Sequence, residues 1–107
     1  MPRAENAARH ELPGLDERAL SAARAADLLL AAAAERGAGR WSRELGGVPD
    51  ALRDGDLGQV RRAAVRSRSA YGPKDSVRDA LPAEVTEPFL REIDRLLKEL
   101  ARLDRAR

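Results

Sequence analysis

The hydrophobic and polar positions near the C-terminal end of the chain recur with the period of an α-helix. Between Thr86 and Leu103, seven large apolar residues fall within one arc when the chain is placed at 100° per residue. The charged residues between Arg91 and Arg102 fall outside that arc. This partition predicts an amphipathic helix with one face suited to packing. Its apolar residues are Phe89, Leu90, Ile93, Leu96, Leu97, Leu100 and Leu103.

A second long helix is predicted between Asp16 and Arg36. Asp16 is a suitable N-cap, Gly37 and Gly39 are suitable stops, and the alanine-rich sequence between them favours helix formation. One face of this helix carries mostly small residues, which would let another helix approach closely: Ala19, Ala22, Ala23, Ala26, Leu29, Leu30 and Ala33. Residues 1–14, which end in Pro13 and Gly14, are predicted to be a flexible N-terminal tail. Residues 15–107 then form a single helical domain.

An apolar stripe in the middle of the chain predicts one bent helix or two short ones. Its members are three or four residues apart, but Gly46 and Gly47 interrupt them. Pro49 has no backbone N–H to donate to the carbonyl of Leu45. The stripe consists of Trp41, Leu45, Val48 and Leu52.

Capping residues predict where the next helices begin. Gly55 is suited to close one helix and Asp56 to cap another that runs from about Leu57 to Ser69. Ser76 and Asp79 have the spacing of a capping box, which would open a short helix ending before Pro82.

The last helix is expected to be capped by Thr86 or Glu87, with Pro88 tolerated in its first turn. No segment shows the two-residue alternation of a strand. The chain is therefore predicted to be all-α, a small helical bundle of three main helices plus one or two short helices.

Composition narrows the classes of protein that fit. The chain has 107 residues, no cysteine and a net charge of +2. Disulfides and thiolate sites are therefore excluded, and a cytoplasmic location is expected. The longest apolar run, Leu28 to Ala34, is too short to span a bilayer, so no membrane association is expected. Arginine far outnumbers lysine, which indicates either phosphate recognition or a GC-rich genome.

No constellation of catalytic residues is evident. His10 is the sole histidine and lies in the predicted tail, so it has no second catalytic group beside it. The aspartates near turns are explained by capping, and the paired glycines by helix ends. We therefore predict no enzymatic activity, cofactor or metal. Trp41 and Tyr71 are interpreted as core anchors, since large aromatic side chains dominate core energetics.

Asp27 lies near the apolar arc of the first long helix. A carboxylate buried there without a partner would be unfavourable. Either this edge of the helix is solvated or an arginine reaches the carboxylate.

The sequence predicts an interaction module that serves as an adaptor, regulator or accessory subunit. The apolar face between Phe89 and Leu103 would contact another protein or a second copy of the chain, unless it packs within its own bundle. The alternative is nucleic-acid binding by the basic segment 57–74, unless its charges form an ordinary solvated face. The basic residues concerned are Arg61, Arg62, Arg66, Arg68 and Lys74.

A helix is followed in order by Trp41, a Gly55-Asp56 step, a Tyr71-Gly72 step and a turn from Ser76 to Asp79. This order resembles a family of small bacterial helical domains of unknown function. The resemblance covers residues 32–81. It implies a compact helical fold and no activity, and it assigns no functional residue.

Overall fold

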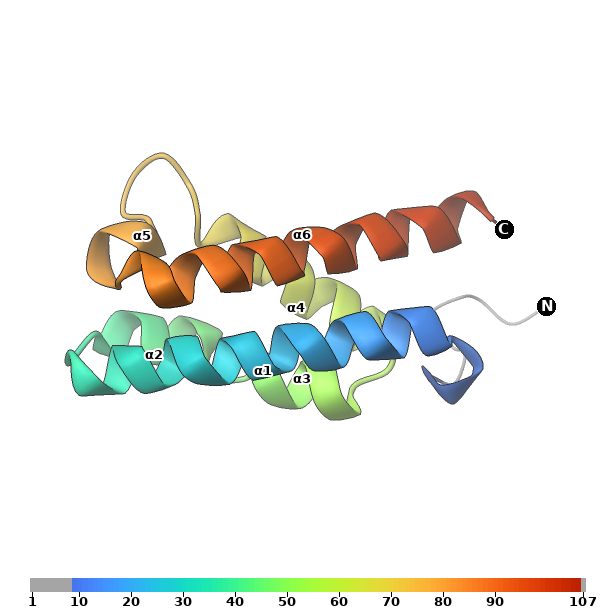
Figure 1. The fold of residues 1–107 in the computed structure, drawn as a ribbon, viewed down its shortest axis with the longest axis horizontal. Helices are drawn as coiled ribbons and strands as arrows, with labels where there is room; N and C mark the ends of the chain where they lie inside the picture. Colours follow the sequence, from blue (N-terminus) through green and yellow to red (C-terminus); the bar gives the residue numbers. More distant parts are fainter. Residues whose placement is uncertain (1–8, 107) are drawn as a thin grey trace.

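The computed structural model describes residues 9–106, and within this range the chain forms helices and no strand (Figure 1). The all-α prediction is confirmed. The elements are a short 3₁₀ turn η2 (Arg9–Glu11) and the helices α1 (Pro13–Glu35), α2 (Gly39–Leu45), α3 (Val48–Asp54), α4 (Leu57–Ser69), α5 (Val77–Ala80) and α6 (Ala83–Arg105).

Four helical segments lie side by side along the 46 Å long axis of the molecule. The two longest helices, α1 and α6, run antiparallel and pack against each other (Figure 1). The short helices α2 and α3 follow one another along α1, and α4 packs between α3 and α6. The neighbouring pairs thus form a closed four-sided bundle in which α2 and α3 together make one broken side.

Helix α1 begins earlier than predicted. Pro13 occupies its first turn, where a missing N–H costs nothing, so Pro13 and Gly14 start the helix instead of ending a tail. Asp16 lies in the first turn rather than at the N-cap, and its carboxylate lies 2.9 Å from the guanidinium of Arg9. Gly37, at φ +67°, follows the end of α1 as predicted, whereas Gly39 opens α2. Residues 1–8 of the predicted tail lie outside the described range.

The central apolar stripe forms two short helices, one of the two predicted alternatives. The break falls at Gly46 and Gly47, and Pro49 lies in the first turn of α3. Both predicted caps are present. Asp56 accepts the backbone N–H of Gln59 at 2.8 Å, and Ser76 and Asp79 form a reciprocal capping box.

Helix α6 begins at Ala83, with Pro82 as its N-cap, so the prediction of a cap at Thr86 or Glu87 is wrong. Pro88 lies inside the helix, where its missing N–H leaves the carbonyl of Glu84 without its usual helical donor. This loss is tolerated because Glu84 is exposed in the first turn, where water can reach the backbone.

The core lies between the apolar faces of α1 and α6 and is closed by α3 and α4. The small side chains of α1 that were predicted to allow close approach are buried, including Ala22, Ala26 and Ala33. Trp41 and Tyr71 are both less than a tenth exposed and belong to the same hydrophobic core, as predicted.

Candidate functional site

The apolar face of α6, the predicted contact surface, is largely used by the chain itself. The fully buried members are at most 2 % exposed: Phe89, Ile93, Leu96 and Leu100. Leu90, Leu97 and Leu103 are half-buried and pack against the core. The small residues on the inner face of α1 are covered in the same way, because α1 and α6 pack on each other. A partner could reach these buried side chains only if the bundle opened.

The basic residues predicted for nucleic-acid binding are divided by the fold between two sides of α4. The two terminal guanidinium nitrogens of Arg61 each donate a hydrogen bond of 2.9 Å to the carboxylate of Asp104, and the guanidinium of Arg68 lies 3.2 Å from the carboxylate of Asp94. Both acids belong to α6, so these arginines connect two helices of the bundle. Lys74 is exposed in the loop between α4 and α5.

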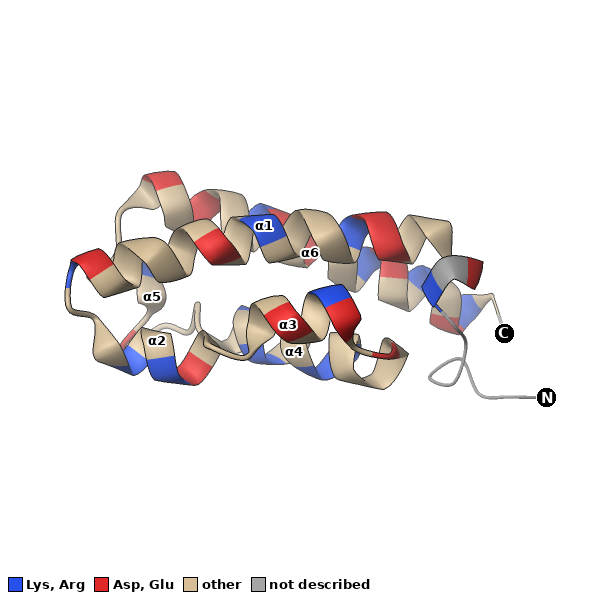
Figure 2. Ribbon diagram, turned by 90° about the horizontal axis from the view of Figure 1, so that it is seen from below, with Lys and Arg blue, Asp and Glu red and all other residues tan. Residues whose placement is uncertain are grey.

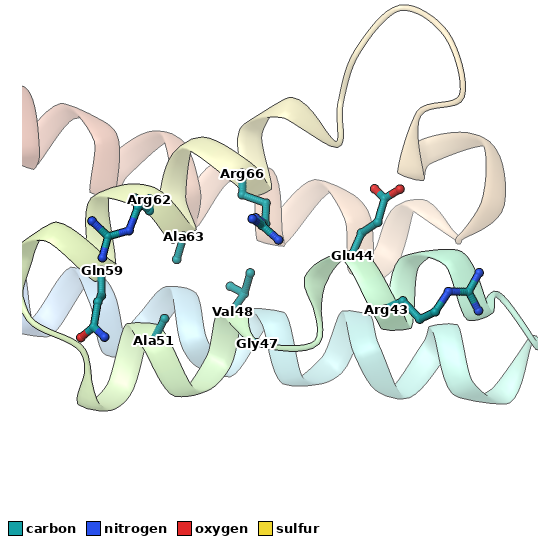
Figure 3. A pocket seen from close by; sticks show the side chains of 9 residues that line it. All are labelled: Arg43, Glu44, Gly47, Val48, Ala51, Gln59, Arg62, Ala63 and Arg66. Atoms are coloured by element: carbon teal, nitrogen blue, oxygen red, sulfur yellow. The ribbon is translucent and has the colours of Figure 1, made fainter.

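Arg62 and Arg66 lie on the other side of α4 and line a groove of about 340 Å³ between this helix and the α2–α3 arm (Figure 3). A third arginine, Arg43, comes from α2 at the far end of the groove, and its side chain points away from Arg62 and Arg66 toward Gly39 (Figure 3). The floor of the groove consists mainly of residues with small or apolar side chains. The remaining lining residues are Glu44, Gly47, Val48, Ala51, Gln59 and Ala63.

The charges around this groove are unbalanced. Glu44, its one acidic lining residue, pairs with Arg40 at 3.1 Å, and Arg40 in turn stacks over the ring of Trp41. In the described part of the chain, Arg43, Arg62 and Arg66 have no carboxylate within 4 Å. Figure 2 shows the basic positions of α4 beside the mixed charges of α3. The groove is therefore a surface on which the guanidinium groups of Arg62 and Arg66 are available to a ligand, with Arg43 at its far end.

The chemistry available in this groove is binding. Guanidinium groups recognise carboxylates and phosphates through paired hydrogen bonds, and the lining offers no nucleophile with an adjacent base. Within residues 9–106, no three His, Asp or Glu side chains gather in a way that could hold a metal ion. Among the same residues, none of the helices is both long and apolar enough to cross a bilayer. The side chain of His10 lies outside what the structure describes.

Two further polar contacts connect parts of the bundle to one another. Tyr71 donates its hydroxyl to the carbonyl of Thr86 at 2.5 Å, and burial raises the pKa of this phenol. Arg78 packs over the Tyr71 ring and forms two hydrogen bonds with Glu87, which lower the pKa of that carboxyl. Together these contacts hold the α4–α5 loop, through Tyr71, and α5, through Arg78, against α6.

Asp27 has both of the features that the sequence left as alternatives. Its side chain is about half exposed, and Arg53 of α3 reaches it with two hydrogen bonds. The guanidinium of Arg53 lowers the pKa of the Asp27 carboxyl. The pair links α1 to α3 at the edge of the core.

The sequence interpretation missed Arg43 as a partner of Arg62 and Arg66. Arg43 is separated from them by about twenty residues and a helix break, so no local spacing connects them. Only the fold reveals that the three arginines line one groove, because α2 and α3 run back along α1 and bring Arg43 close to α4.

No protein-family model matches this chain, and no curated protein or solved structure shows significant similarity to it.

Proposed function

We propose that this chain is a small non-enzymatic interaction module that binds an acidic, amphipathic segment of another protein in the groove between α3 and α4. The observation that carries this proposal is a set of arginines around an apolar floor that have no carboxylate partner among the described residues: Arg43, Arg62 and Arg66. An acidic segment would supply the missing counter-charges, and its apolar side would cover the floor.

The spacing of the arginines favours a helical ligand. Arg62 and Arg66 are one turn apart on α4, which places them about 6 Å apart along the helix axis. Two carboxylates one turn apart on a ligand helix have the same spacing. Gly47, Ala51 and Ala63 have small or no side chains and leave room for larger apolar groups of the ligand.

The groove is less suited to nucleic acid than to a protein segment. Glu44 lies on its rim, and α3 carries the exposed acids Asp50 and Asp54. A continuous phosphate backbone would meet these negative charges, whereas a protein segment can place its carboxylates only where the arginines are. The predicted nucleic-acid site on α4 also has Arg61 and Arg68 engaged with α6.

Binding of a labelled peptide of about 15 residues tests the proposal. The peptide carries leucines on one side and glutamates one turn apart on both flanks, and fluorescence anisotropy reports its affinity. We expect the triple variant Arg43→Gln, Arg62→Gln, Arg66→Gln to bind about ten-fold more weakly or worse, a loss of about 1.4 kcal/mol. Glutamine keeps the helix propensity while removing each charge.

Two controls identify the source of the affinity. A scrambled peptide with the same composition has the same charge but no apolar side, and it should bind clearly more weakly than the patterned peptide. The variant Ala63→Leu fills the groove without changing charge and should also weaken binding. Equal affinity of the patterned and scrambled peptides, or an unchanged affinity in the arginine variant, would refute the proposal.

A further inference from the structure

The outer side of α6 carries a row of basic residues that the groove does not include. They follow one another at intervals of four, three, four and three residues, which keeps them on one side of a helix. All of them are exposed, and the row extends about 21 Å at 1.5 Å per residue. We call this row the α6 ridge; it consists of Arg91, Arg95, Lys98, Arg102 and Arg105.

The acids near the α6 ridge are already engaged. On the side facing α1, Glu92 pairs with Arg95 at 2.8 Å, and Glu99 accepts hydrogen bonds from Arg102 at 3.1 Å. The hydrogen bonds from Arg102 lower the pKa of the Glu99 carboxyl, which keeps it ionised and paired.

On the side facing α4, Asp94 pairs with Arg68 and Asp104 with Arg61. These two α4 arginines were predicted to contact nucleic acid directly. In the bundle they neutralise the two acids on this flank of the ridge. In the described residues, Arg91, Lys98 and Arg105 have no carboxylate within salt-bridge distance.

The ridge is hollowed where α6 meets α1. A cavity of about 320 Å³ lies there, lined by Arg18 of α1 together with four residues of the ridge and Glu99. This cavity adds a sixth cation from a second helix, so the basic surface extends across the α1–α6 edge of the bundle. The arginine-lined groove belongs to α2, α3 and α4 and shares no residue with this surface.

We propose that the α6 ridge binds the sugar-phosphate backbone of nucleic acid without reading its sequence. A straight row of cations along one helix matches a linear array of phosphates, and arginine pairs with phosphate through two hydrogen bonds. The ridge contains no apolar side chain that could enter a membrane, since the large apolar residues of α6 lie on its other face, where they are buried or half-buried against the core. It also lacks the apolar floor that distinguishes the groove.

Binding of a fluorescent duplex of about 20 base pairs, measured by anisotropy between about 50 and about 200 mM salt, tests this inference. With three phosphates neutralised, we expect log K of the wild-type chain to fall with log salt at a slope of about −3. The variant Arg91→Gln, Lys98→Gln, Arg105→Gln should bind at least about ten-fold more weakly at the lowest salt and lose most of that slope.

The groove variant Arg43→Gln, Arg62→Gln, Arg66→Gln is the matched control, because it removes the same three charges. It should bind the duplex within about three-fold of wild type. Circular dichroism of both variants confirms that the helices are retained. Absence of wild-type binding at low salt would overturn the inference, as would an equal loss in both variants, which would assign binding to net charge.

Two further ligands separate the alternatives. Vesicles of phosphatidylserine and phosphatidylcholine test for a membrane surface, and polyglutamate tests for an acidic protein. We expect both to bind more weakly than the duplex. Stronger, ridge-dependent binding of either ligand would overturn the assignment to nucleic acid. The groove peptide serves as a cross-check, since the ridge variant should bind it as wild type does.

Discussion

The two sides of α4 carry similar arginines in opposite circumstances. Arg61 and Arg68 face α6 and each pairs with an aspartate there, whereas Arg62 and Arg66 face the groove and pair with no acid of residues 9–106. Adjacent positions in the sequence, 61 and 62, therefore belong to two different surfaces. One pair of arginines takes part in the fold, and the other remains available for a ligand.

The difference lies in the helix opposite. Helix α6 runs antiparallel to α4 and places Asp104 near Arg61 and Asp94 near Arg68. Helix α3 is short, and it lines the groove only with Val48 and Ala51, next to its N-cap residue Gly47. Whether a basic residue on a helix surface forms an ion pair within the fold thus depends on the charge of the helix opposite, which its own helix does not determine.

The largest expected effect on stability comes from enlarging the alanines on the two sides of α4. Ala64 is fully buried in the core, whereas Ala63 is 7 % exposed and lies on the groove floor. Ala64→Leu should lower the free energy of unfolding by about 1–3 kcal/mol because it overpacks the core. Ala63→Leu should cost clearly less, because its side chain can extend into the groove. Urea unfolding measures both, and equal losses would show that the groove is not open space.

The next effect distinguishes the two arginine pairs. Arg61→Gln should lower the free energy of unfolding by about 1 kcal/mol, since it removes two hydrogen bonds to Asp104 and both side chains are only partly exposed. Arg62→Gln should change it by less than about 0.5 kcal/mol, as expected for an exposed site without a partner.

A double-mutant cycle with Asp104→Asn isolates the ion pair from other effects of the substitution. The double variant should be less destabilised than the sum of the two single variants. Strict additivity would mean that the pair seen between α4 and α6 contributes nothing to stability.

The fold was predictable to a large extent because its signals are local. The amphipathic pattern of α6, the break at Gly46 and Gly47, and the caps at Asp56 and Ser76 each lie within a few residues of the structure they produce. The predicted start of α6 is wrong because it rests on the preference of proline for the first turn of a helix. In the structure Pro88 lies further inside, and Ala83 opens the helix.

The candidate sites were predictable only in part. Arg62 and Arg66 were found as basic residues, but their separation from Arg61 and Arg68 depends on where α3 and α6 pack. The apolar face of α6 is a packing face, as predicted, and its partners are α1 and α4 of the same chain, which is one of the two alternatives that the sequence left open. The regular spacing of the ridge from Arg91 to Arg105 can be recognised in the sequence. Which arginines pair with the acids on either side of the ridge cannot be predicted from the sequence.

A smaller effect is expected on acidification. Arg53 lowers the pKa of Asp27, and Arg102 lowers that of Glu99, so both carboxyls stabilise the fold when ionised. This stabilisation is fully present above the unfolded-state values near about pH 4 and is lost as the pH falls through the lowered values. The free energy of unfolding should therefore be flat from about pH 7 to about pH 5 and decline below about pH 4.

Removing a paired carboxyl and removing the groove arginines should affect the acid-unfolding profile differently. Asp27→Asn removes one of the titrating groups and should flatten the decline in acid. The groove variant should keep the wild-type profile, because the three arginines that it replaces have no carboxylate partner among the described residues. A changed profile in the groove variant would reveal an ion pair formed there in solution.

The smallest expected effect has the opposite sign to the others. Arg62 and Arg66 are like charges one turn apart, which destabilises a helix by about 0.2–0.5 kcal/mol at low salt. Arg66→Gln should therefore raise the free energy of unfolding by this amount, and the gain should vanish in high salt as the repulsion is screened. Urea unfolding at two salt concentrations measures it, with Arg68→Gln as the control that should lose stability because it breaks the pair with Asp94. A substitution that stabilises the fold while weakening peptide binding would indicate that the charge at position 66 serves the ligand at the expense of the helix. If Arg66→Gln instead destabilises the chain as Arg68→Gln does, the distinction between the two sides of α4 fails.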